Sequence, residues 1–185
     1  PDLAGIIICP SAALSMKQLP MTAPLHNSIA PYAKLRAAGM NMIRVWGGGY
    51  YEQDWFYDLC DELGIMVWQD FQFACNLYPA DEGFLAEVRE EVGYQVRRLQ
   101  HHACMAVWCG DNELIGALNW FPESRANRDR YLAAYDRLNH TVEQAAKSAD
   151  PTINWWPSSP SPGPLSFGDA WHDDPPRPGG GPVDS

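Results

Sequence analysis

The chain is poor in positive charge. Its 185 residues include 13 Lys and Arg against 23 Asp and Glu, which gives a formal net charge of −10. Nucleic-acid binding requires a concentrated basic surface, and the only local basic cluster joins Arg97 and Arg98 to His101 and His102. Positive charge is favoured at a helix C-terminus by the macrodipole, so we interpret this cluster as a solvated helix end. We therefore expect no nucleic-acid partner.

Long apolar runs and paired cysteines are also missing. No segment approaches the roughly 20 apolar residues that cross a bilayer, so we expect no membrane partner. The five cysteines contain no Cys-x-x-Cys pair and are odd in number, which argues against a zinc motif or a disulfide framework. Cys60, Cys104 and Cys109 lie within apolar patterns, which favours packing in a core. No metal and no cofactor are predicted.

Three short apolar runs are each followed by glycine or polar residues. They cover residues 41–46, 65–71 and 106–109. Runs of this length are typical of buried strands, and catalytic residues sit at the carboxyl ends of barrel strands. Glu113, four residues beyond the third run, is therefore the first catalytic candidate. The alternative is a helix start, with Asp111 or Asn112 as the N-cap and Glu113 in the first turn.

Helical patterns separate these runs. Apolar residues recur at spacings of three and four, with glycine just beyond two of the segments; the segments are 31–38, 52–63, 84–99 and 127–149. Strands that alternate with amphipathic helices predict βα units around a parallel sheet. A last apolar run at 153–156 is interpreted as a further strand.

Four motifs in this order resemble the catalytic barrel of the β-mannosidases of glycoside hydrolase family 2. They are Gly-Met-Asn-Met-Ile-Arg-Val-Trp-Gly-Gly-Gly at 39–49, Val-Trp-Gln-Asp-Phe at 67–71, Trp-Cys-Gly-Asp-Asn-Glu at 108–113 and Trp-Pro-Ser-Ser-Pro-Ser at 156–161. The resemblance covers roughly residues 37–161. Four ordered motifs are far more specific than one Asn-Glu pair.

The resemblance implies an α/β fold, an incomplete (β/α)8 TIM barrel with roughly the first five βα units. A complete barrel needs about 250 residues, and this chain has 185 and begins with Pro, so we expect an interior piece of a longer product. Residues 1–150 are assigned to the partial barrel, and 151–185 to the fifth-strand region and a loose tail rich in Pro and Gly. Within that tail, His172 receives no role.

The resemblance also implies roles for single residues. Glu113 matches the general acid/base, and Asn112 matches the amide that holds the 2-hydroxyl of the sugar. Trp46 and Asp70 match residues that line the subsite for the terminal sugar, and Arg44 matches the arginine that orients the nucleophile. A guanidinium fork can hold a carboxylate through two bonds. For Arg44 and Asp70, a structural ion pair within the barrel is the alternative.

Two features depart from the family pattern. Position 111 is Asp where the family usually has Asn, which adds a negative charge close to Glu113. A retaining glycosidase needs a second carboxylate about 5–5.5 Å from the first, and in the family it is a Glu at the end of the seventh strand. After Glu113 the only glutamates are Glu123, in a Pro-containing loop, and Glu143, within a helical run. We therefore expect the nucleophile to be missing.

The expected function is that of a fragment of a retaining glycoside hydrolase that cleaves terminal β-mannosides or manno-oligosaccharides. The isolated chain is expected to be inactive. One alternative is a non-catalytic or vestigial carbohydrate-binding protein, in which Trp and Asp residues still hold a sugar. Another is a β-galactosidase or β-glucuronidase relative, although the Trp-Gly-Gly-Gly and Trp-Pro-Ser-Ser-Pro motifs favour a mannosidase. Five tryptophans fit either a sugar platform or barrel packing: Trp46, Trp68, Trp108, Trp155 and Trp156.

Overall fold

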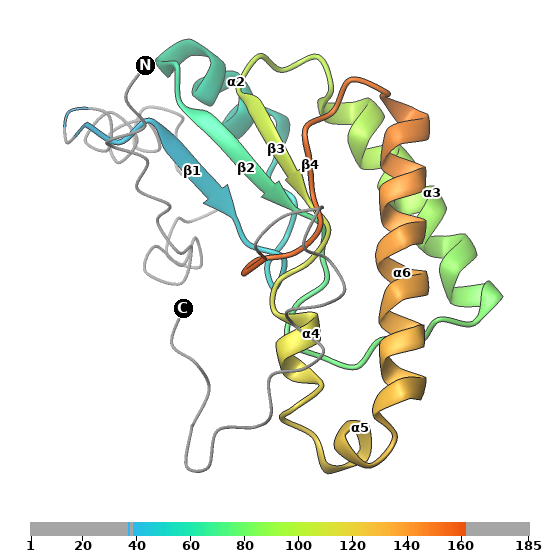
Figure 1. The fold of residues 1–185 in the computed structure, drawn as a ribbon. Coiled ribbons are helices and arrows are strands. Elements are labelled where there is room, and N and C mark those ends of the chain that lie inside the picture. Colours follow the sequence, from blue (N-terminus) through green and yellow to red (C-terminus); the bar gives the residue numbers. More distant parts are fainter. Residues whose placement is uncertain (1–36, 38, 162–185) are drawn as a thin grey trace.

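The computed structural model describes residue 37 and residues 39–161 (Figure 1). All of the helix expected over 31–38 except residue 37, and the position of His172, lie outside the described residues. The elements follow one another as β1 (Met42–Val45), α2 (Asp54–Leu63), β2 (Met66–Asp70), α3 (Glu82–Leu99), β3 (Met105–Cys109), α4 (Leu114–Ala117), α5 (Pro122–Ala126), α6 (Arg128–Ala149) and β4 (Trp155–Trp156). The predicted strands and long helices within this part are confirmed.

The strands form one parallel sheet in the order β1-β2-β3-β4. Met42 pairs with Met66, Trp68 with Val107, and Trp108 with Trp155. Parallel pairing requires a crossover between strands, and the helices supply it. The α/β class is therefore confirmed, and the carboxyl ends of all four strands lie at the same edge of the sheet.

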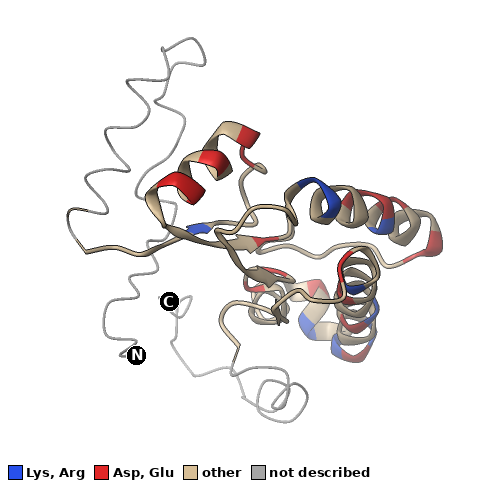
Figure 2. Cartoon of the chain, turned by 90° about the horizontal axis from the view of Figure 1, so that it is seen from above, with Lys and Arg blue, Asp and Glu red and all other residues tan. Residues whose placement is uncertain are grey.

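Local sequence sets where the helices begin and end. Gly64 caps the C-terminus of α2, and its φ of 63° is the left-handed conformation that glycine adopts at low cost. Asp81 caps the N-terminus of α3, where its side chain accepts a hydrogen bond from the backbone N–H of Phe84 at 3.2 Å. The loop expected at Glu123 is instead the short helix α5, because Pro122 at its start favours helical backbone. Figure 2 shows only acidic charges on α2 and both signs on α3 and α6.

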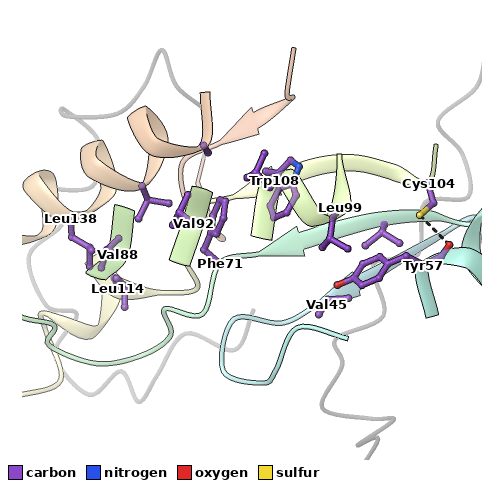
Figure 3. Close-up of a cluster of buried hydrophobic side chains, with 14 of the residues drawn as sticks. Val45, Tyr57, Phe71, Val88, Val92, Leu99, Cys104, Trp108, Leu114 and Leu138 are labelled. Atoms are coloured by element: carbon purple, nitrogen blue, oxygen red, sulfur yellow. Dashed lines mark hydrogen bonds between the residues drawn. The ribbon is translucent and has the colours of Figure 1, made fainter. Parts of the chain in front are cut away.

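The apolar faces of α2, α3 and α6 pack against one face of the sheet (Figure 3). Phe71 and Trp108 stack there with ring centroids 5.0 Å apart. Each large apolar side chain that is fully buried contributes roughly 1.5–3 kcal/mol. Cys60, Cys104 and Cys109 are buried as predicted. No helix in the described part of the chain is both long and apolar enough to cross a membrane.

Successive side chains of a strand point to opposite faces of the sheet, and β2 separates its residues accordingly. Val67 and Gln69 point towards the helices, where the Tyr57 hydroxyl donates to Gln69 at 2.7 Å. Trp68 points to the other face, where its ring meets that of Trp156 edge to face at 6.4 Å. The side of the sheet away from the core cluster therefore carries aromatic and polar groups.

The basic cluster at the end of α3 is not a solvated helix end throughout. His102 is buried, and its Nδ1 lies 2.7 Å from Oδ2 of Asp61. Arg98 forms an ion pair with Asp54. Arg97 and His101 are exposed as expected. The interpretation was wrong for His102 because its partner is 41 residues away in the sequence.

Candidate active site

Polar side chains from three successive strands meet at the carboxyl edge of the sheet. Arg44 comes from β1, Asp70 ends β2, and Asn112 follows β3. The Arg44 guanidinium binds Asp70 through two bonds, from Nη2 to Oδ2 at 2.7 Å and from Nε to Oδ1 at 3.2 Å. The same Nη2 also donates to Oδ1 of Asn112 at 2.7 Å. Arg44 thus joins all three strand ends.

Asp70 is fully enclosed. Its exposed fraction is 0%, and its oxygens also accept from the Gly47 N–H at 3.0 Å and from Trp68 Nε1 at 2.8 Å. Burial raises the pKa of Asp70, and the charge and hydrogen bonds of Arg44 partly offset the rise. A carboxylate has about four acceptor positions, and four donors are bound. In this geometry Asp70 anchors Arg44, as in the ion-pair alternative, and does not face open space.

Asn112 also contacts Cys75, a residue that the sequence did not indicate. The Asn112 Nδ2 donates to Cys75 Sγ at 3.4 Å, and Sγ donates to Oε2 of Glu113 at 3.4 Å. We call Asp70, Arg44, Asn112, Cys75 and Glu113 the rim network. No motif signalled Cys75, because it lies in the loop after β2 and its partners are 37 and 38 residues away.

Glu113 is half-buried and has a φ of 63°, which is uncommon for a residue with a side chain. Its backbone N–H donates to the Ser159 carbonyl at 2.9 Å. The expected strand ends at Cys109, and a helix does begin here, but its N-cap residue is Glu113 and not Asp111 or Asn112. The side chain of Asp111 accepts from the Leu114 N–H at 3.3 Å.

Asp111 also binds residues on α6 and on the loop after β4. Its Oδ1 accepts from Ser158 Oγ at 2.6 Å, and its Oδ2 accepts from Asn139 Nδ2 at 3.1 Å. Burial raises the pKa of Asp111 to about 7, against the lowering effect of these hydrogen bonds. Asp111 therefore fixes the chain segment that precedes Glu113.

Trp46 follows β1 at the same edge and is 37% exposed. Its ring lies directly over Gly48, where an added Cβ would come between 2.1 and 2.4 Å from ring atoms. Glycine at position 48 is therefore required for this placement of the indole. Trp108 is a core residue that is 3% exposed, which fits barrel packing.

Most of the chain is similar in sequence to known β-mannosidases. No protein-family profile matches the chain. The β-mannosidase of Mus musculus is 49% identical over 137 residues, which are 72% of this chain and 16% of the mouse protein. The probable β-mannosidase of Caenorhabditis elegans is 42% identical over 127 residues, 68% of this chain and 14% of that protein. The chain thus spans about one sixth of the mouse relative.

Two solved glycosidase structures are similar in fold to most of this chain. The β-D-mannosidase of Dictyoglomus thermophilum is 42% identical, with a TM-score of 0.59 over 70% of this chain and 16% of that one. A β-glucuronidase of Bacteroides uniformis has a TM-score of 0.60 over 84% of this chain and 18% of that one, at 20% identity. At 20% identity, the similarity to the β-glucuronidase shows a shared fold and nothing more.

Proposed function

Because the chain is homologous to a segment of the β-mannosidases, we propose that it forms part of the catalytic barrel of a retaining glycoside hydrolase of family 2 that cleaves terminal β-mannosides. Four parallel strands with helices on one face support a portion of an eight-stranded barrel. The identity of 42% to a β-D-mannosidase against 20% to a β-glucuronidase favours mannosides among the sugars of the family.

Glu113 is the proposed general acid/base. It would protonate the departing glycosidic oxygen and then activate water. Its position at the carboxyl edge, half-buried and next to Asn112, supports this role. The side-chain oxygen Oδ1 of Asn112 accepts a hydrogen bond from Arg44, and the side-chain nitrogen Nδ2 donates one to Cys75. We assign its second amide hydrogen to the sugar 2-hydroxyl, a contact that strengthens in the transition state.

Arg44 is the proposed orienting group for the nucleophile, and Asp70 holds it in place through two hydrogen bonds. Because Asp70 is enclosed, we assign it this anchoring role in preference to direct contact with the sugar. Trp46 offers an exposed aromatic face to the apolar face of a pyranose. The rim network, which joins Asp70 to Glu113 through Arg44, Asn112 and Cys75, is the observation that carries the proposal.

The nucleophile is proposed to come from residues beyond this chain. Glu123 lies on α5 and contacts the Tyr131 hydroxyl, and Glu143 lies on α6 and accepts from Lys147 at 2.6 Å. Neither follows a strand. An acid without its nucleophile cannot form the glycosyl-enzyme intermediate. The isolated chain should therefore not hydrolyse aryl β-mannosides.

A hybrid enzyme tests the proposal. Residues 41–161 would replace the matching segment of the Dictyoglomus thermophilum β-D-mannosidase, which keeps its own nucleophile. We expect the hybrid to hydrolyse an aryl β-mannoside in preference to the matching β-glucoside and β-galactoside, and to need Glu113. A folded hybrid without β-mannosidase activity, or one indifferent to Glu113→Gln, would contradict the proposal.

A further inference from the structure

We propose that Cys75 is a positioning residue for Glu113, its thiol bridging the Asn112 amide and the Glu113 carboxylate. The inference rests on the proposed function, because it gives Cys75 a task in the acid/base step. Cys75 does not contact the reacting bond in this account. It acts only through the orientation of Glu113.

The backbone of Cys75 is held in an uncommon conformation. Its φ is 52°, in the left-handed region that is unfavourable for a residue with a side chain. Two contacts enforce this: the Cys75 N–H donates to the Asn112 carbonyl at 3.0 Å, and the Asn112 N–H donates to the Phe73 carbonyl at 2.9 Å. Just before Cys75, the Ala74 N–H donates to the Tyr78 hydroxyl at 3.0 Å. The loop after β2 is thereby fastened to the end of β3.

This backbone places the sulfur between two polar groups. Sγ accepts from Asn112 Nδ2 and donates to Oε2 of Glu113, both at 3.4 Å. Arg44 donates to the side-chain oxygen Oδ1 of Asn112 at 2.7 Å. The side-chain amide of Asn112 therefore presents its nitrogen to the sulfur. Glu113 also has a positive φ. Two residues in uncommon conformations therefore face each other across one S–H hydrogen bond.

A thiol suits this position chemically. A general acid/base alternates between its protonated and ionised forms, and a strong donor would favour the ionised form. A thiol is a weak donor, so it can orient the carboxylate and still allow both forms. Burial, followed by the hydrogen bond and the charge of Glu113, raises the pKa of Cys75. The thiol therefore keeps its proton at neutral pH.

Alkylation of the 185-residue chain tests the contact. The pH dependence of iodoacetamide modification would be followed on the Cys75 peptide by mass spectrometry, which separates it from the other cysteines. We expect Glu113→Gln to shift the profile to lower pH, because the neighbouring charge is removed, and Glu113→Asp to give an intermediate profile. The exposed Glu123, changed to Gln, is the matched control and should leave the profile unchanged. Profiles of both Glu113 variants that coincide with the wild type would overturn the contact.

Carboxyl ¹³C NMR of the same chain tests positioning. The Glu113 resonance would be assigned by its loss in Glu113→Gln. We expect Cys75→Ala to displace it and Cys75→Ser, which keeps a donor, to displace it less. No displacement, or equal displacement in both variants, would overturn the positioning role. Neither measurement uses glycosidase activity, so an inactive hybrid enzyme would reject the proposed function separately.

Discussion

The two ends of the sheet hold similar chemical groups in different surroundings. At the carboxyl edge, the rim network combines two carboxylates, a thiol, an amide and a guanidinium group. At the opposite end, Asp61 of α2 lies close to His102 and Cys104, which come just before β3 in the sequence. One carboxylate oxygen, one imidazole nitrogen and the sulfur of these residues lie within 4.8 Å of one another. We call these three residues the amino-end cluster.

The two clusters differ in backbone conformation and in which of their residues are buried. His102 and Cys104 are each 5% exposed, and Asp61 accepts from the Cys104 N–H at 2.6 Å and lies 2.7 Å from His102. These contacts tie α2 to the start of β3. In the rim network, Cys75 and Glu113 are half-buried and both have positive φ. Residue type alone therefore does not distinguish the two clusters, whereas backbone conformation does: the positive φ values occur only in the rim network.

The largest expected difference between the two ends concerns catalysis. In the hybrid enzyme, Glu113→Gln should lower kcat for an aryl β-mannoside by about 10²–10⁴-fold, the usual contribution of a general acid/base. Asp61→Asn should leave kcat within about twofold at a temperature where the hybrid is folded, because its effect is on stability. Steady-state kinetics would measure both. Equal losses would remove the functional distinction between the two ends.

Within the rim network, Arg44 should matter most for stability. Arg44→Met leaves the enclosed Asp70 without its ion-pair partner, and breaking a buried pair costs about 3–5 kcal/mol. Arg89 forms an exposed pair with Glu82, so Arg89→Met should change stability far less than Arg44→Met does. Urea denaturation would give both free energies of unfolding. A similar small change for the two variants would show that Asp70 does not depend on Arg44.

Asp111 should make stability depend on pH. Its pKa is about 7 when folded and about 3.9 when unfolded, so the folded state binds the extra proton between these values. Stability should therefore fall as pH rises from about 4 to about 7, by up to about 4 kcal/mol. Asp111→Asn should remove this decline, and the exposed Asp129→Asn should not. Urea denaturation between about pH 4 and about pH 7 would measure the free energy of unfolding at each pH. If that free energy fell with pH in Asp111→Asn as steeply as in the wild type, Asp111 would not be the group responsible.

Asp61 should show the opposite dependence. Burial raises its pKa, but the hydrogen bonds from His102 and the Cys104 N–H outweigh burial and lower it overall. Its stabilising effect is therefore present above about pH 4 and is lost as pH falls through the lower folded value. Asp61→Asn should cost about 1–3 kcal/mol at neutral pH and converge with the wild type in acid. Thermal unfolding of this variant and of the exposed Glu62→Gln would show whether the cost is specific.

Strand ends were predictable from the sequence, and side-chain partners were not. Apolar runs and helical spacing located β1 to β4 and the long helices, and parallel pairing then brings Arg44, Asp70 and Asn112 to one edge. Cys75 carried no signal, because its position between Asn112 and Glu113 depends on a turn with positive φ. Asp111 meets Ser158 from 47 residues away. Such long-range contacts depend on packing, which local patterns do not encode.

The most direct test of Glu113 as the acid/base compares leaving groups in the hybrid enzyme. Protonation by the acid matters most when the departing alcohol is a poor leaving group. We predict that Glu113→Gln greatly slows cleavage of methyl β-mannoside and only slightly slows formation of the glycosyl-enzyme from dinitrophenyl β-mannoside, measured in the pre-steady state. Equal slowing of the two substrates would contradict the central claim that Glu113 delivers the proton.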